Sequence, residues 1–328
     1  MNKTTIHCRM TASMFIAGVE KRKNAQGRDE AIPEPPELRA AGIKGCMRFI
    51  WRALQRAEDI GALRKREGEL FGNAFGDNAT RASGMRMRIA NFQKMSEYGI
   101  GEHYEKMAPH REDPNYVGPN KDKPLRVLAL KNGGTFDVII TSFCRIETHI
   151  KYVRLFTLTC LLYGFGRRSR KGFGTVVVTG VDGDGREIDW TFDGIVKSLK
   201  ALSEFGADYS WLNDLEISAG GGGAADYPYI ENIRIAGSKT FVSTDGIIKQ
   251  IGMAVHNAAA PPAVDPVFLG SHNPRSRFAS SVLLSTVPWG VDGQRKDEYC
   301  CIATQLHCTK AFNPTNRTDF YVDLDGRV

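Results

Sequence analysis

Along residues 1–182 the pattern of hydrophobic residues changes between that of a strand and that of a helix. The order in which strands and helices follow each other restricts the fold. Strand-like runs, alternating or rich in β-branched residues, cover 5–16, 83–92, 135–143 and 175–181. Two stretches between them have helical character instead. In 43–63 the apolar residues Ile43, Met47 and Leu54 share one face, and 150–165 is apolar on most sides. The chain order is therefore strand–helix–strand–strand–helix–strand.

This order is that of the ferredoxin-like fold, which RRM domains share. A small antiparallel sheet then carries two helices on one face, and its open face is where such domains usually bind RNA. Residues 183–328 contain a similar mixture, with helices expected at 190–206 and 244–259 and strands at 229–237, 239–243, 277–289 and 298–308. We therefore expect an α+β protein with two ferredoxin-like (RRM-like) domains in tandem, 1–182 and 183–328.

Three segments have the composition of surface loops. Residues 17–37 are polar and contain prolines, 97–124 are rich in Gly and Pro, and 218–228 contain four consecutive glycines. The second of these is long enough to predict an insertion in the first domain.

Charge and cysteine content indicate the class of partner and the compartment. The chain has 328 residues and a formal net charge of +7, and its basic residues concentrate at 39–66 and 167–171. Local basic patches suit a polyanionic partner. The seven cysteines form no Cys-x-x-Cys pair and have no zinc-like spacing with histidine, which predicts reduced thiols, no metal site and a cytoplasmic protein. The longest apolar run, 155–165, is too short to cross a membrane.

The densest positive charge lies in the glycine-rich loop GFGRRSRKGFG, residues 164–174. Arg167, Arg168, Arg170 and Lys171 can donate to phosphate oxygens, and Ser169 can add one hydroxyl hydrogen bond. A Walker A loop and a Rossmann loop both lead from a strand into a helix, whereas this loop leads from a helix into a strand. We therefore expect no nucleotide cofactor and predict binding of a nucleic-acid backbone; the alternative is a solvated turn with basic side chains.

A second basic row lies on the helix predicted at 43–63. Lys44, Arg48 and Arg52 step by four residues, beside the apolar face, and no acidic residue stands four residues away from any of them. This row predicts a continuation of the phosphate-binding groove, and its alternative is a solvated helix face. Trp51 lies on the apolar face and is expected in the core.

Two histidines are candidates for a different chemistry. His7 lies in the first predicted strand and His149 precedes the second long helix. Either could act as a general base on a ribose 2′-hydroxyl. Asp182 and Asp184 stand in a DGDG sequence typical of a turn rather than of a metal site.

Three motifs in order resemble the RAMP superfamily of CRISPR–Cas proteins, and most of all the family of the first subunit of the type III-B Cmr effector complex. These motifs are Ile43-Lys44-Gly45 with Arg48-Phe49 and Trp51-Arg52, then Glu69-Leu70-Phe71-Gly72, then the loop from Gly166 to Gly174. Further on, RFASS at 277–281 resembles an Arg-x-x-Ser-Pro element, with Ser281 in the place of Pro.

The resemblance implies a non-catalytic, RNA-binding subunit at the head of the complex, near the 3′ end of the guide, that helps capture target RNA in antiviral defence. Its implied partners are the crRNA guide, the single-stranded target RNA and other Cmr-complex subunits, especially the sixth. The alternative within the superfamily is a metal-independent endoribonuclease that processes precursor guide RNA, with His7 or His149 as the base near the loop.

Overall fold

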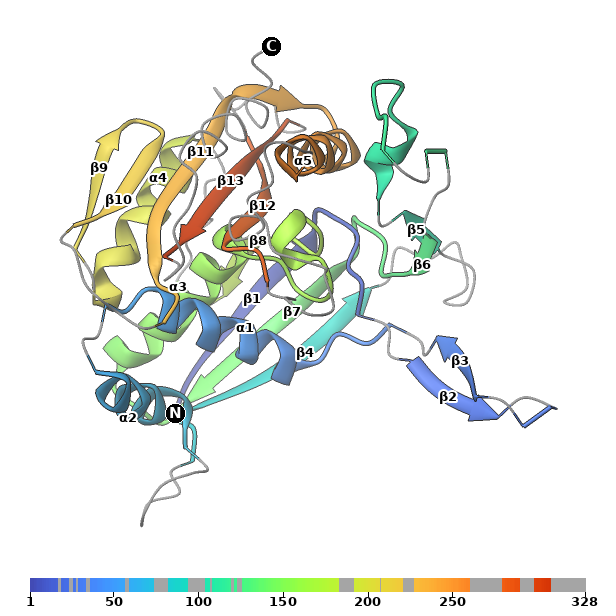
Figure 1. Ribbon diagram of the computed structural model, residues 1–328. Coiled ribbons are helices and arrows are strands. Elements are labelled where there is room, and N and C mark those ends of the chain that lie inside the picture. The colour runs from blue at the N-terminus through green and yellow to red at the C-terminus, as the bar shows by residue number, and fades with distance from the viewer. Residues whose placement is uncertain are drawn as a thin grey trace.

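Two antiparallel sheets form the body of the protein in the computed structural model (Figure 1). The structure describes residues 1–16, 19–23, 26–27, 29–33, 36–56, 59–73, 82–93, 104–106, 108–118, 121–122, 126–182, 192–206, 208–220, 227–259, 279–289 and 298–307. The α+β class and the two antiparallel sheets confirm the fold expected from the sequence.

The first sheet has the strand order β4-β7-β1-β8. Its strands are β1 (Asn2–Met10), β4 (Met85–Gln93), β7 (Thr135–Ser142) and β8 (Val176–Asp182). Read backwards, the order is fourth, first, third and second in the chain, which is the ferredoxin-like arrangement. Alternate residues of β1 (Ile6, Cys8 and Met10) point into the core, while Lys3 and Arg9 lie exposed on the open face.

Helices α1 (Ala40–Ala53) and α3 (Ile146–Leu162) cover the apolar face of this sheet, and α2 (Ile60–Phe71) packs against α1. The prediction of a single helix at 43–63 is wrong, because two helices, α1 and α2, occupy this segment. Asp59 ends the connection between them by accepting hydrogen bonds from the backbone N–H groups of Gly61 and Ala62. The aspartate is an N-cap, and a new helix therefore begins at Ile60.

The second sheet has the strand order β12-β13-β11-β10-β9. The elements of this half are α4 (Phe192–Lys200), η3 (Ala201–Phe205), β9 (Tyr209–Asn213), β10 (Glu216–Ala219), β11 (Ile230–Phe241), α5 (Thr244–Ala259), β12 (Val282–Pro288) and β13 (Tyr299–Leu306). The unit β11-α5-β12-β13 places β13 between β11 and β12, as in the first sheet. The strand on the other side of β11 comes from the β9–β10 hairpin, which precedes it in the chain and which the sequence patterns did not predict.

The two sheets share one core through α3. Residues 155–162 of this helix are all buried, because the first sheet lies on one side and β12 and β13 contact the helix on another. Along β12, Leu283 and Val287 belong to this shared core, whereas Val282 and Leu284 pack with α5 in a second cluster. The second sheet is therefore covered on both faces.

Short elements lie outside the two sheets. Residues predicted as a loop at 17–37 include a hairpin of β2 (Val19–Lys23) and β3 (Asp29–Pro33), beside the first sheet in Figure 1. The predicted insertion at 97–124 contains β5 (Tyr104–Lys106), which pairs with β6 (Arg126–Leu128) just after it, and η1 (Pro109–Glu112), which contacts α5. An ion pair of 3.0 Å between Asp113 and Lys249 lies at this contact. Among the described residues, none of the helices has the length and apolar character to cross a bilayer.

Candidate nucleic-acid interface

The glycine-rich loop is held between the two halves of the molecule. It starts after Tyr163, contains the short helix η2 (Ser169–Lys171), and leads into β8. The backbone N–H groups of Arg167 and Gly174 donate to carbonyls of Phe15 and Ser13, which follow β1. The N–H of Gly172 donates to the carbonyl of Leu284 in β12, at 3.0 Å. These N–H groups are therefore occupied by the protein itself.

Packing explains the loop glycines. Gly174 has a φ of +67°, and a Cβ there would lie 1.9 Å from the carbonyl oxygen of Phe165. Gly172 has a φ of +80°, and its Cβ would lie 2.8 Å from Ile251 in α5. Both positions require glycine, whatever the loop binds. The glycines therefore fix the loop geometry, and its side chains carry any contact with a ligand.

The side chains of the loop differ in accessibility. Arg167 is exposed, Arg168 and Arg170 are half-buried, and Ser169 is buried. The guanidinium of Arg170 donates to the carbonyl of Ser280, in the RFASS segment, and its Cζ lies 5.3 Å from the ring centre of Phe49. The predicted phosphate contact of Ser169 requires the loop to open, whereas Arg167 can reach a ligand directly.

Lys171 has an unusual environment for a predicted phosphate ligand. Its Nζ atom is buried and has no hydrogen-bond partner among the residues that the structure describes. Burial, together with the nearby Arg168 and Arg170, lowers the pKa of Lys171 to about 7. The ammonium is therefore destabilised in the free protein, and an anion that reached it would restore its charge.

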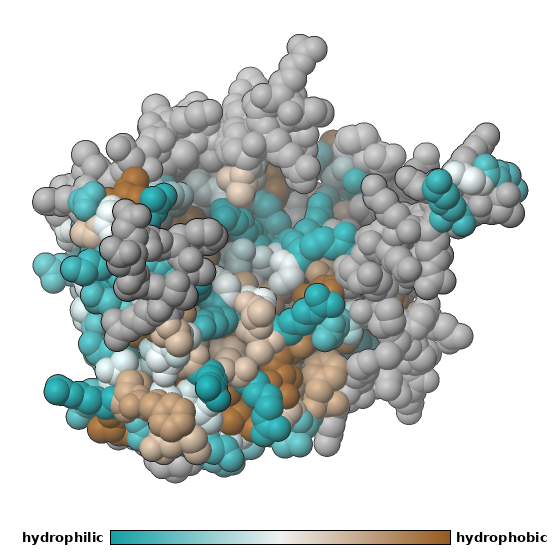
Figure 2. Space-filling view, turned by 90° about the horizontal axis from the view of Figure 1, so that it is seen from below, coloured by the Kyte–Doolittle hydropathy of each residue, from teal (hydrophilic) through white to brown (hydrophobic). Residues whose placement is uncertain are grey.

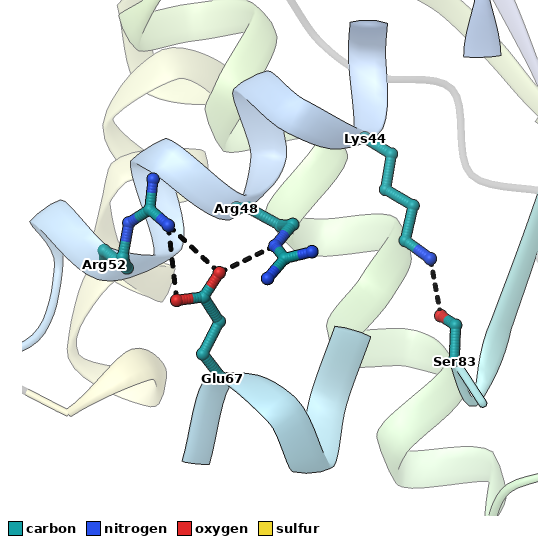
Figure 3. Close-up of polar contacts among 5 residues, drawn as sticks. All are labelled: Lys44, Arg48, Arg52, Glu67 and Ser83. Carbon is teal, nitrogen blue, oxygen red and sulfur yellow. Dashed lines mark hydrogen bonds and ion pairs between the residues drawn. The ribbon is translucent and has the colours of Figure 1, made fainter. Parts of the chain in front are cut away.

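The basic row on α1 is present, but it is partly neutralised (Figure 3). Nε of Arg48 donates to Oε1 of Glu67 at 2.6 Å, and Arg52 donates to the same oxygen at 3.1 Å. Glu67 comes from α2 and is only 6% exposed. Lys44 instead donates to Ser83 at 2.7 Å, and burial, with the charge of Arg48, lowers its pKa.

Glu67 is a functional candidate that the sequence patterns did not single out. No acid lies at helical spacing from Arg48 or Arg52 within α1, but the fold brings one from the next helix. Leu63, Glu67 and Phe71 recur every four residues and form the buried face of α2. Glu69, which carries the family motif, is exposed. The position of Glu67 on the same helical face as Leu63 and Phe71 could have indicated in the sequence that its carboxylate is buried and paired.

Two aromatic rings join the loop to α1. The rings of Phe49 and Tyr163 are 5.4 Å apart, and both residues are partly buried. Phe49 stands between Arg48 and Arg52 in the sequence and also contacts Arg170. The two basic segments predicted separately therefore meet at Phe49. Cations interleaved with aromatic rings are typical of surfaces that bind single-stranded nucleic acid.

The two candidate histidines are both held by neighbouring side chains. His149 is buried, 2.9 Å from Oγ1 of Thr4 and 2.8 Å from Oγ of Ser142. On the open face of the first sheet, Nδ1 of His7 lies 2.7 Å from Asp137, and Nε2 lies 3.2 Å from Asp182. Hydrogen bonds to these two aspartates raise the pKa of His7. Neither ring nitrogen of His7 is therefore free to accept a ribose proton in this arrangement.

Other polar groups in the described part of the chain show no metal-binding arrangement. There, His, Cys, Asp and Glu side chains form no group of three or more that could hold a metal ion. The described cysteines are all free, and burial raises the pKa of Cys46 to about 11, so this thiol stays protonated at neutral pH. The described residues do not include Asp184, Arg277, Cys308 or the last three glycines of the run, 221–223.

A family comparison places the first half of the chain in a known group. The sequence profile of the RAMP superfamily matches residues 13–177, which include α1 and the whole glycine-rich loop. The chain belongs to the RAMP superfamily. None of the curated proteins compared with the sequence matches it.

Solved structures extend the likeness of this RAMP protein to the full chain. Cmr1 from Pyrococcus furiosus, in its apo form, is 15% identical with a TM-score of 0.53, over 100% of this chain and 97% of that one. A chain of the type III-B Cmr-beta complex bound to cognate target RNA is 9% identical with a TM-score of 0.53, over 98% of both chains. A second structure of Cmr-beta, with target RNA, AMPPnP and ssDNA, gives 11% identity and a TM-score of 0.51 over 98% of both chains. These likenesses establish a Cmr1-like fold.

Proposed function

We propose that this RAMP protein is an RNA-binding, non-catalytic subunit of a type III-B CRISPR RNA-guided effector complex. It acts in the cytoplasm at the head of the complex, near the 3′ end of the guide, and helps capture target RNA in antiviral defence. Membership of the superfamily and the Cmr1-like fold over the full chain support this assignment. Its partners are the crRNA guide, the single-stranded target RNA and other Cmr-complex subunits, especially the sixth.

One observation carries the proposal. Arg170 stacks over Phe49, so the glycine-rich loop contacts the helix that carries the α1 cations. The proposed RNA contacts on this surface are Lys44, Arg48, Arg52, Arg167, Arg168, Ser169, Arg170 and Lys171. A backbone-directed surface of this kind leaves sequence specificity to base pairing with the guide.

The endoribonuclease alternative needs a free general base near the loop. His149 is buried against Thr4 and Ser142, and both nitrogens of His7 face carboxylates. The described residues therefore give this alternative less support than the binding role. The endoribonuclease alternative predicts cleavage of RNA without metal, which the denaturing gel described below would detect.

The test measures the salt dependence of binding to single-stranded RNA, followed by a denaturing gel of the recovered RNA. In an Arg167→Ala/Arg170→Ala variant we expect weaker binding. The slope of log affinity against log salt should fall by about 0.7 for each phosphate that the variant no longer neutralises. The matched control, Lys197→Ala/Lys200→Ala, removes the same charge from exposed positions on α4 and should change binding little.

Two results would contradict the proposal. Equal losses of affinity in the loop variant and in the α4 control would mean that binding follows net charge rather than this surface. Discrete cleavage products from the wild type without metal would favour the endoribonuclease.

A further inference from the structure

We propose that a cavity beside Phe49 holds one unstacked nucleobase of the bound RNA. This inference rests on the proposed RNA-binding function and deepens it. The cavity has a volume of about 330 Å³ and lies between α1, α2 and residues 227–228 of the second half. A volume near 300 Å³ is at the lower end of the range for small-ligand sites.

The walls of the cavity are mainly apolar. They are formed by Phe49, Ile60, Leu63, Tyr227 and Pro228. Ile60 is 41% exposed, which is unusual for a large apolar side chain at the start of a helix. Figure 2 views the molecule from below, the side on which α2 lies in Figure 1, and shows hydrophobic and hydrophilic residues side by side.

Both aromatic walls are held in place by contacts outside the cavity. The hydroxyl of Tyr227 donates to the carbonyl of Gln55 at 2.9 Å. Phe49 is held between Tyr163 and Arg170. A planar base entering the cavity therefore meets rings whose positions are already fixed. Stacking of bases on aromatic side chains is the usual way in which proteins hold unpaired RNA bases.

The polar groups of the cavity suit a base better than a phosphate. They are Arg52, Arg64 and Glu67. A carboxylate has about four acceptor sites, and Arg48 and Arg52 use three of them in the contacts with Glu67. The edge of a nucleobase presents donors and acceptors side by side, which a carboxylate beside a guanidinium can match. A phosphate would be repelled by the carboxylate.

Phe49 also connects the cavity to the glycine-rich loop, along which the RNA strand is proposed to lie. The ring lines the cavity and contacts Arg170 of the glycine-rich loop. A strand whose phosphates lie on Arg167 and Arg170 can therefore turn one base into the cavity next to the loop. Arg64, which is exposed, lies at the same cavity and can contact the adjoining phosphate.

The first test compares two changes at one wall, in the full-length protein. Tyr227→Phe removes only the hydroxyl, whereas Tyr227→Ala removes the ring. Because Tyr227→Phe keeps the ring and loses only the hydrogen bond to Gln55, we expect it to weaken binding of single-stranded RNA much less than Tyr227→Ala does. Tyr227→Ala should weaken binding by roughly 5- to 100-fold, as expected for the loss of one stacked base. Equal affinities of the two variants would overturn the inference.

A Glu67→Gln variant separates a base from a phosphate. Because the change also frees Arg48 and Arg52 for phosphate, the affinity for RNA is compared with the affinity for an abasic strand of the same length. If a base donates to this carboxylate, Glu67→Gln lowers the affinity for RNA relative to the affinity for the abasic strand. If a phosphate occupies the cavity, both affinities rise equally, and the inference is overturned. Thermal unfolding of the variant shows the temperature below which both proteins are folded and can be compared.

Photo-cross-linking tests the inference without any substitution. Single-stranded RNA containing 4-thiouridine is cross-linked to the wild type, and the modified peptides are mapped. Cross-links at Phe49 or Tyr227 are expected. Cross-links confined to 166–171 would remove the base site and leave the proposed function intact, whereas absence of any RNA binding would remove both. A Tyr227→Ala protein that binds RNA normally but fails to join its complex would assign the cavity to a protein neighbour instead.

Discussion

Lys171 combines a sequence prediction with a cost that only the structure shows. The lysine was expected to bind phosphate because of its place among arginines, but its Nζ is buried without a hydrogen-bond partner in the described part of the chain. Its pKa of about 7 lies well below the usual value, because burial and the two arginines disfavour the ammonium. The unfolded chain therefore binds a proton at this lysine that the folded protein releases, from pH 7 up to the ordinary pKa of lysine.

This difference has a definite sign. Because the unfolded state holds more protons in that range, Lys171 makes the free energy of unfolding rise as the pH rises above about 7. We expect Lys171→Met to be more stable than the wild type at pH 6, by about 1–3 kcal/mol, the cost of a buried donor without a partner. Urea unfolding from pH 6 to pH 10 measures the difference, which should shrink toward high pH. A difference in the free energy of unfolding that stays constant from pH 6 to pH 10 would contradict the lowered pKa of Lys171.

At the level of residues, a cluster of charge can be recognised in the sequence, whereas the ion pairs between distant residues cannot. Arg167 and Arg170 stand out because four cations occur within five positions, and this is visible in one dimension. Glu67 lies 19 residues after Arg48 and 15 after Arg52, and only the packing of α2 on α1 makes them partners. No local pattern contains that information.

At the scale of elements, the glycine-rich loop is a packed connection as well as a basic one. We expect Gly174→Ala to destabilise the protein by more than about 1–2 kcal/mol, the cost of a left-handed residue with a Cβ, because the new Cβ also meets the carbonyl of Phe165. The matched control is Gly45→Ala in α1. At Gly45 a Cβ meets nothing within 4 Å, so alanine should stabilise the helix by about 0.5–1 kcal/mol.

Thermal or urea unfolding of the two alanine variants measures both changes. Equal, small effects would mean that the loop tolerates a Cβ and is not fixed by its contacts with Phe165 and β12. RNA binding of the folded Gly174→Ala protein then shows whether loop geometry is needed for the interface.

Element-level predictions were best where periodicity is strong. The strands of the first sheet and α3 and α5 follow from alternating or helical apolar patterns. The β2–β3 hairpin was missed because its residues are mostly charged and their sequence has no alternating apolar pattern. The helix break before Ile60 was missed because 43–63 was read as one helix, although Leu63 lies outside the apolar register of Ile43, Met47 and Leu54, and because the capping role of Asp59 was not considered.

At the scale of the whole molecule, the tandem arrangement was predicted but the shared core was not. Composition placed a turn-rich segment after Asp182, and the boundary between 182 and 183 stays a prediction. The order of β10 and β11 in the second sheet could not be read from the sequence, because a hairpin can join either edge of a sheet. The sequence gives one indication that the halves pack together: the helix predicted at 150–165 is apolar on most sides, as expected when both halves cover it.

The shared core makes a prediction about cooperativity. Residues 155–162 of α3 are buried between the first sheet and strands β12 and β13, so separating the halves would expose them. We therefore expect the full chain to unfold in one transition, and a fragment of residues 1–182 to be poorly soluble. Trp51 lies in the first half, and the other three tryptophans follow residue 182.

A Trp51→Phe variant therefore reports only the second half by fluorescence, while far-ultraviolet circular dichroism reports both halves. Coincident urea midpoints from the two signals are expected, because loss of either sheet uncovers the same helix. Two separated midpoints, or a 1–182 fragment that is soluble with the midpoint of the full chain, would show that the halves are independent. In that case the contact of the glycine-rich loop with β12 would be a docking contact between domains, and RNA could change their relative position.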